Sequence, residues 1–187
     1  MQINQTIFLA TLVAASALFG CQGKKEITPL DGGGKEIILY CSGPDYQTDG
    51  KTFRASGFET SEKMNFALDQ AKERARQELA TSIKTTVKVV SERYQNENEI
   101  GSSSETIEQW ESKVQSVVNQ VVVGTPLICE RIVKVDNKFT AYCAVEMASS
   151  DLLQGLSSRL SSEQRELIDT RSAAFTEVFN QVMAEQE

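Results

Sequence analysis

Histidine is absent from this chain of 187 residues, and tryptophan occurs only once. Without histidine, nucleophile activation of the Ser-His-Asp or Cys-His kind, histidine-ligated metal sites and proton transfer by imidazole are all excluded. Positive charge is also scarce, because 19 Lys and Arg stand against 26 Asp and Glu and give a formal net charge of −7. We therefore expect no nucleic-acid partner, which would require a basic face.

The remaining composition is that of a folded domain. Hydrophobic residues make up 40% of the chain and charged residues 24%, a balance that favours a buried core over disorder. At this length we expect one domain of about 100–150 residues together with shorter appendages.

The first 20 residues combine a lack of charge with a short apolar run. No charged side chain occurs from Ile3 to Gly20, and the apolar stretch 7–15 has the size of a signal-peptide core rather than of a membrane span. The segment ends in Leu18-Phe19-Gly20-Cys21, which resembles the lipobox of bacterial lipoproteins. The resemblance implies cleavage before Cys21, acylation of that cysteine with chains such as palmitate, and a stable membrane anchor. The alternative is a cleaved signal peptide without lipid.

The chain divides into four segments by pattern. We expect a signal peptide over residues 1–20, a lipidated amino terminus and flexible tether over 21–50, an α+β domain over 51–148 and a helical extension over 149–187. Gln22, where an aspartate would stand in the sorting rule of some Gram-negative bacteria, favours the outer membrane over the inner one. Which face of the outer membrane the domain occupies stays open.

The expected domain begins with a strand and a long helix. Residues 52–58 alternate in polarity, with Phe53, Ala55 and Gly57 on one side. Ser61 can cap a helix of about 30 residues, and a second helix with a capping box at Ser102 follows after residue 104. The apolar stripe of the long helix is Met64, Leu68, Ala71, Ala75, Leu79, Ile83, Val87 and Val90. Trp110 lies on the stripe of the second helix and is interpreted as a core residue.

Two further strands, at about 127–135 and 138–147, predict a hairpin that turns at Asp136-Asn137. The expected buried face comprises Leu127, Cys129, Val133 and Val135 on the first strand and Phe139, Ala141, Cys143, Val145 and Met147 on the second, with Arg131 interrupting it. Because Cys129 and Cys143 share this face, we expect a disulfide between them in an oxidising compartment. Pairing of Cys41 with either one is the alternative arrangement, and free buried thiols are the third.

The carboxy-terminal segment predicts two helices, capped by Ser150 and by Ser161. The second helix carries an apolar stripe at nearly heptad spacing. We interpret part of this stripe as a candidate interaction surface for self-association or for an envelope protein; its residues are Ile168, Phe175, Val178, Phe179 and Val182. Packing of the same stripe onto the sheet or the long helix is the alternative.

The order of these elements resembles the Lpp-twenty-like outer-membrane lipoproteins, a family related in domain to flagellar outer-membrane assembly lipoproteins. The residues that carry the resemblance are Phe53-Arg54-Ala55-Ser56-Gly57, the alanine-rich helix and the strand ending Ala141-Tyr142-Cys143-Ala144-Val145-Glu146. The resemblance implies an α+β domain with helices on one face of a small sheet. Together with the patterns above, we expect a small antiparallel sheet with a long helix and a second helix packed on one face, followed by carboxy-terminal helices. It implies an envelope role without catalysis and supplies no active-site residues.

We therefore expect a noncatalytic envelope lipoprotein that acts as a structural or interaction module, is held to the membrane by lipid, and has no catalytic residue, cofactor or metal. One alternative is a small-ligand carrier. The other is a histidine-free hydrolase that uses a Ser-Lys dyad or a carboxylate pair. The pairs Glu108 with Glu111 and Glu163 with Glu166 each share a helical face, and we interpret them as solvated surface charge.

Overall fold

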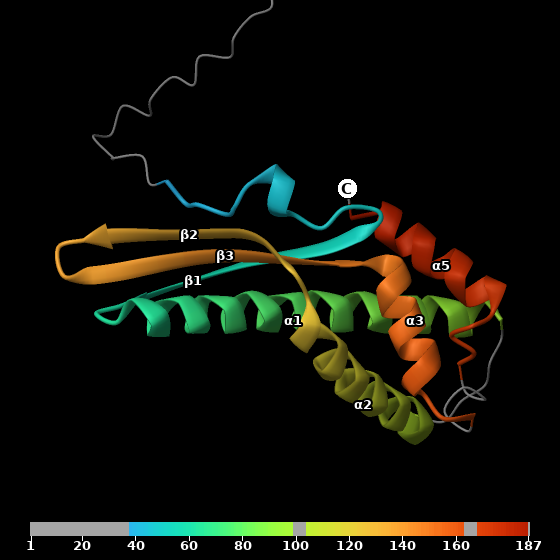
Figure 1. Cartoon of the computed structure of the whole chain (residues 1–187). Coiled ribbons are helices and arrows are strands. Elements are labelled where there is room, and N and C mark those ends of the chain that lie inside the picture. The colour runs from blue at the N-terminus through green and yellow to red at the C-terminus, as the bar shows by residue number, and fades with distance from the viewer. Residues whose placement is uncertain (1–37, 99–103, 163–167, 187) are drawn as a thin grey trace, which may run out of the picture. The chain divides into compact units, whose positions relative to one another are not determined.

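The computed structural model describes residues 38–98, 104–162 and 168–186. These residues form an α+β fold with a three-stranded antiparallel sheet, a long helix and further helices, as the sequence predicts (Figure 1). Cys21, Ser102 and the predicted signal peptide lie outside the described residues. In chain order the elements are η1 (Pro44–Tyr46), β1 (Thr52–Ser61), α1 (Met64–Glu97), α2 (Ser104–Val121), η2 (Val122–Gly124), β2 (Leu127–Val135), β3 (Lys138–Ala148), α3 (Ser149–Arg159) and α5 (Ala173–Ala184).

The sheet has the order β1-β3-β2, so β1 and β2 are its two edge strands. β1 pairs with β3 without interruption, placing Phe53 opposite Met147 and Gly57 opposite Cys143. β2 and β3 form the predicted hairpin around Asp136-Asn137, and Asp136 has the positive φ, 52°, that such a tight turn requires. The buried face predicted for β3 is confirmed, because Ala141, Cys143 and Val145 have no exposed surface.

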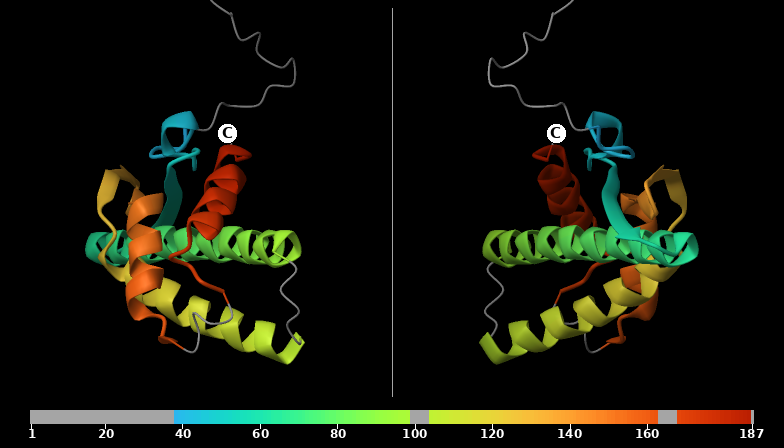
Figure 2. Two further views of the ribbon diagram at one scale, coloured as in Figure 1. Left: turned by 90° about the vertical axis from the view of Figure 1, so that its right-hand side faces the viewer. Right: turned by 90° about the vertical axis from the view of Figure 1, so that its left-hand side faces the viewer.

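Helix α1 runs along the sheet on the face formed by these residues (Figures 1 and 2). Its small residues Ala67, Ala71 and Ala75 are fully buried, which lets the helix backbone approach β1 closely. At Gly57 the approach is closest: a Cβ built there would stand 2.5 Å from the Ala75 nitrogen and 2.7 Å from the Ala71 oxygen. Only glycine therefore fits at this point of β1.

The predicted long helix is confirmed, including its β-branched second half, and it begins slightly later than expected. Lys63 occupies the N-cap position without a side-chain cap, and the Ser61 hydroxyl instead accepts a hydrogen bond from the Lys63 N–H at 3.1 Å. Met64 is 43% exposed and so lies outside the buried stripe.

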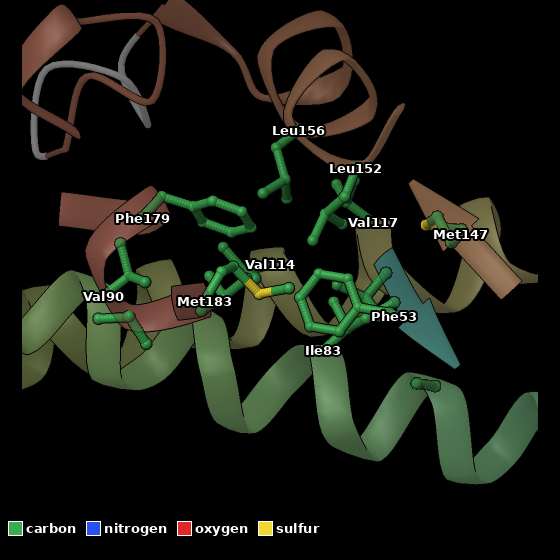
Figure 3. Close-up of a cluster of buried hydrophobic side chains, with 14 of the residues drawn as sticks. Phe53, Ile83, Val90, Val114, Val117, Met147, Leu152, Leu156, Phe179 and Met183 are labelled. Atoms are coloured by element: carbon green, nitrogen blue, oxygen red, sulfur yellow. The ribbon is translucent and has the colours of Figure 1, made fainter. Parts of the chain in front are cut away.

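The main core lies where the second half of α1 meets α2, α3, α5 and the end of the sheet (Figure 3). Phe53 of β1 contacts Phe179 of α5 edge to face, at 6.3 Å between ring centroids. Trp110 is buried in this core, as predicted. Helices α3 and α5 thus share one core with the sheet and are not an extension beyond it; their residues in this core are Leu152, Leu156, Leu160, Phe175, Val178, Phe179, Val182 and Met183.

The predicted interaction surface on the last helix is wrong, because all five of its residues are buried: Ile168, Phe175, Val178, Phe179 and Val182. Residues 168–171 are not helical, and Ser172 begins α5 by accepting a hydrogen bond from the Phe175 N–H at 3.0 Å. The predicted apolar stripe therefore spans two segments that do not form one continuous helix. α3 likewise begins at Ser149, with Ala148 as its N-cap in place of the predicted Ser150.

The predicted buried face of β2 is also wrong. The two-residue turn places Cys129 and Val133 opposite Ala144 and Thr140, on the face away from α1. A register irregularity between Leu127 and Cys129 leaves Leu127 opposite Val145, on the α1 side. Arg131 is exposed on that outer face, so it does not interrupt the buried face as predicted. Glu130, on the α1 side, forms an ion pair with Lys72 of α1 at 3.1 Å.

The predicted Cys129–Cys143 disulfide is wrong for the same reason. The turn has two residues, so Cys129 pairs with Ala144 and Cys143 with Glu130. Paired residues share a face and successive residues alternate, which points the two cysteines to opposite faces of the sheet. Cys129 is bonded instead to Cys41, the alternative partner. Cys143 is a free thiol beneath α1, where burial raises its pKa and so keeps it protonated.

The disulfide predicts a distinct pattern in cysteine variants. Replacing Cys41 or Cys129 with serine should lower the free energy of unfolding by about 4–5 kcal/mol, because the cross-link joins residues 88 apart in sequence and restricts the unfolded chain. Cys143→Ser is the control and should leave the cross-link in place. Nonreducing peptide mapping and urea unfolding measure both effects. A peptide linking Cys129 to Cys143 would contradict the pairing.

Burial of the α5 stripe predicts that Phe175→Glu strongly destabilises the fold. Phe175 has no exposed surface and packs edge to face on Tyr94 at 5.5 Å. We expect a loss of at least the about 3–5 kcal/mol typical of truncating a buried Phe, because an unpaired charge is added to the core. The matched control is Phe66→Glu on α1, where the ring is 54% exposed. Equal melting temperatures for the two variants would show that Phe175 is not a core residue.

Candidate functional site

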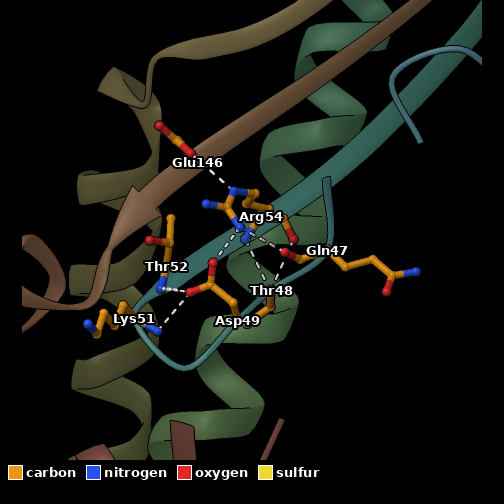
Figure 4. Close-up of polar contacts among 7 residues, drawn as sticks. All are labelled: Gln47, Thr48, Asp49, Lys51, Thr52, Arg54 and Glu146. Atoms are coloured by element: carbon orange, nitrogen blue, oxygen red, sulfur yellow. Dashed lines mark hydrogen bonds and ion pairs between the residues drawn. The ribbon is translucent and has the colours of Figure 1, made fainter. Parts of the chain in front are cut away.

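The guanidinium of Arg54 lies at the centre of a polar cluster beside β1 (Figure 4). Arg54 alternates with Phe53 and Ala55 on β1 and therefore lies on the face away from α1. Its Nε donates to Glu146, the residue opposite it on β3, at 3.1 Å, and its Nη1 donates to Asp49 at 2.6 Å. Nη1 also donates to the Gln47 carbonyl at 3.1 Å.

Asp49 completes this arrangement from the loop that precedes β1. One carboxylate oxygen accepts hydrogen bonds from the backbone N–H groups of Lys51 and Thr52, each at 2.8 Å, while the other meets Arg54. The Lys51 N–H and the Arg54 guanidinium hold the pKa of Asp49 below its usual range. Arg54, Asp49, Glu146 and the Gln47 carbonyl are thus bound to one another, and the cluster acts as a clamp that fixes residues 47–52 on the sheet.

The clamp also closes part of the free edge of β1. The Thr48 hydroxyl accepts from the Arg54 N–H at 3.1 Å and donates to the Arg54 carbonyl at 3.2 Å. Two residues earlier on β1, the Thr52 carbonyl accepts a hydrogen bond from the Asp49 N–H at 3.0 Å. The backbone groups of Thr52 and Arg54 therefore point away from β3, and the loop satisfies them as a neighbouring strand would.

Beyond the clamp the same edge borders an open groove of about 800 Å³, which we call the edge groove. Its walls are residues 46–48 of the loop, residues 54–58 of β1 and the flank of α1. On that flank Arg74 forms an ion pair with Glu59 at 2.7 Å, and Glu73 accepts from the Gln77 amide at 3.3 Å. Glu73 and Glu78 have no ion pair among the described residues.

An aromatic cluster lies on the outer face of the sheet, near the disulfide. Tyr142 of β3 contacts Tyr40 at 5.5 Å and stacks on Phe58 at 6.0 Å between ring centroids. Phe58 is nevertheless 57% exposed. Cys41, expected to belong to a flexible tether, is buried here and is held by its bond to Cys129 and by the hydrogen bond from the Ser56 hydroxyl to its carbonyl.

Of the predicted disulfide residues, the structure joins Cys41 and Cys129. The predicted interaction residues also lie together, but in the buried core. Of the carboxylate pairs, Glu111 meets Lys88 at 3.6 Å, Glu108 is exposed, and both members of the other pair lie outside the described residues. Sequence reasoning missed Arg54, Asp49 and Glu146. The only local signal was the turn-forming Thr48-Asp49-Gly50, because the pairing of Arg54 with Glu146 becomes visible only once the strand register is known.

Within residues 38–98, 104–162 and 168–186, no helix is long and apolar enough to cross a membrane. The same described ranges contain no group of three or more Cys, Asp or Glu residues arranged to hold a metal ion. Comparison of the chain with protein-family models, with curated proteins and with solved structures finds no match.

The clamp predicts an acid-sensitive contribution to stability. A pKa lowered by folding means that ionised Asp49 stabilises the fold fully above its unfolded value of about 3.9, and that the contribution is lost as the pH falls through the lower folded value. Asp49→Asn should therefore be less stable than the wild type near pH 6, by less than about 1 kcal/mol because the pair is partly solvated. The difference should vanish at more acidic pH. Urea unfolding measures this, with Asp45→Asn, an exposed acid in η1, as control; a pH-independent difference would contradict it.

Proposed function

We propose that this chain is a noncatalytic lipoprotein of the bacterial envelope, anchored through lipid on Cys21, whose domain serves as an interaction module at the outer membrane. The observation that carries the proposal is the Cys41–Cys129 disulfide in a chain whose Leu18-Phe19-Gly20-Cys21 segment resembles a lipobox. Disulfides of this kind persist in oxidising compartments, and a lipobox is a signal for export. Two unrelated features thus favour the same location.

The position of the disulfide supports an anchored role for the domain. It joins the chain 20 residues after Cys21 to the edge strand β2, and the Arg54 clamp fixes the next segment to the opposite edge strand, β1. A pull on the amino-terminal segment would therefore be transmitted to the sheet by a covalent bond.

The form of the surface supports interaction rather than catalysis or carriage. The edge groove is open, and its two basic groups, Arg54 and Arg74, are already paired within the chain. Enzyme and carrier sites are usually enclosed pockets in which unpaired polar groups converge. An open groove beside a strand edge instead suits a macromolecular partner.

We also propose membership of the Lpp-twenty-like family. The element order in residues 52–147, a strand, a long helix lined by alanines, a second helix and a hairpin, agrees with the expectation from that resemblance. The resemblance makes no prediction about the buried carboxy-terminal helices or the Cys41–Cys129 bond.

Lipid anchoring is tested by Cys21→Ser in a bacterial host grown with labelled palmitate. We expect the wild type to incorporate label and to sediment with membranes, and the variant to lose the label and to shift to the soluble or unprocessed fraction, because the acyl chains supply the membrane affinity. Cys143→Ser is the matched control, since it also removes a thiol but lies in the folded domain. Unchanged fractionation of Cys21→Ser, with no lipid mass on the mature amino terminus, would refute the anchor.

A further inference from the structure

The free edge of β1 has a short open window. The edge-facing backbone groups of Thr52 and Arg54 are satisfied by the clamp. β1 keeps one continuous register with β3, so the N–H and C=O groups of Ser56 and Phe58 face the same free edge two and four residues later. At Thr60 the N–H is bound by the side chain of Glu59 at 3.1 Å, which closes the far end of the window.

The window opens onto the edge groove. The groove is lined by the loop at residues 46–48, by β1 at residues 54–58 and by the flank of α1, which includes Gln70, Arg74 and Gln77. An added strand would therefore lie beside β1 with alternate side chains directed at this helix flank. Five residues of β1 correspond to about 17 Å, the length of an extended segment of five or six residues.

The charge of the groove selects among such segments. Arg54 is balanced by Asp49 and Glu146, and Arg74 is balanced by Glu59. Glu73 and Glu78 line the groove and have no ion pair among the described residues. The surplus in the groove is negative, so it complements Lys or Arg side chains.

We propose that the edge groove binds an extended, basic segment of a partner protein, which adds a fourth strand to β1 through the backbone groups of Ser56 and Phe58. Recognition by strand addition takes affinity from main-chain hydrogen bonds and specificity from alternate side chains. Here the alternate side chains that face α1 are Lys or Arg, opposite Glu73 and Glu78. This segment is the partner class of the interaction module proposed above.

A second copy of the chain fits the window less well. An antiparallel pair of β1 strands centred on Gly57 would place the two α1 flanks side by side, with Glu73 and Glu78 of one copy near those of the other. Repulsion between these like charges would oppose association of the two copies. The clamp residues would also shorten the paired length, because Thr48 already occupies the edge at Arg54.

The test uses the full chain in detergent and a fluorescein-labelled hexapeptide that alternates lysine and valine, followed by fluorescence anisotropy. We expect saturable binding of this peptide and binding about tenfold or more weaker for the peptide that alternates glutamate and valine. Two further lysine–valine peptides carry N-methyl groups on the backbone nitrogens of one edge or of the other. We expect one of these two peptides to lose binding and the other to keep it, because only one edge of the added strand pairs with β1. Glu73→Lys combined with Glu78→Lys should reverse the charge preference.

The matched variants are Phe58→Pro and Phe58→Val. Both remove the ring, but only proline removes the outward N–H, a position where an edge strand tolerates proline. We expect Phe58→Pro to weaken binding by about tenfold relative to Phe58→Val, as for one lost hydrogen bond in a shielded site. If Phe58→Pro is unfolded, the two methylated peptides on the wild type decide the question instead.

Three results would overturn the proposal: no binding of the lysine–valine peptide, equal binding of the lysine and glutamate peptides, or unchanged binding of both methylated peptides. A fourth is self-association of the wild type that Phe58→Pro abolishes, which would assign the edge to a second copy. The proposal depends on the interaction role above, but the peptide assay does not depend on the lipid. A failed palmitate experiment and a failed peptide experiment are therefore distinguishable.

Discussion

The backbone contact between β1 and α1 at Gly57 is the constraint on which the other features depend. Ala71 and Ala75 leave no room for a side chain opposite them, so the helix backbone lies almost directly against the strand. The contact places α1 along β1 and β3, and its second half then carries Ile83, Val87 and Val90 into the core that α2, α3 and α5 complete. The same placement brings the flank of α1 beside β1, where it forms one wall of the edge groove.

Two attachments convert the segment before β1 into part of the domain. Cys41 is bonded to Cys129 on the outer face of the sheet, and Asp49 is held by Arg54 and by two backbone N–H groups. The first attachment is covalent and insensitive to pH, whereas the second requires an ionised carboxylate. Ordering this loop costs conformational entropy, which the restriction of the unfolded chain by the disulfide partly offsets.

Features that depend on neighbouring residues could be predicted from the sequence, and features that depend on register could not. The α1 stripe from Ala71 to Val90 and the Asp136-Asn137 turn are local patterns, and both are confirmed. The cysteine pairing failed because one residue in the length of a turn decides which face a side chain occupies. The prediction of an interaction surface on α5 failed because the spacing of apolar residues does not reveal whether the residues that cover them belong to the same chain or to a partner. Arg54 was missed because Glu146 is 92 residues away and is identified only by the pairing of β1 with β3.

The two edges of the sheet are treated differently, and this difference is the strongest argument that the window has a role. Edge strands expose backbone groups that invite unwanted pairing, so proteins block them with charges, irregular register or covering loops. β2 carries the register irregularity at Leu127, and it includes the exposed charged residues Glu130, Arg131 and Lys134. β1 is covered at Thr52 and Arg54 and closed at Thr60 by Glu59. Protection alone would not leave Ser56 and Phe58 open between two closed positions beside a polar groove, whereas recognition of an extended segment requires it.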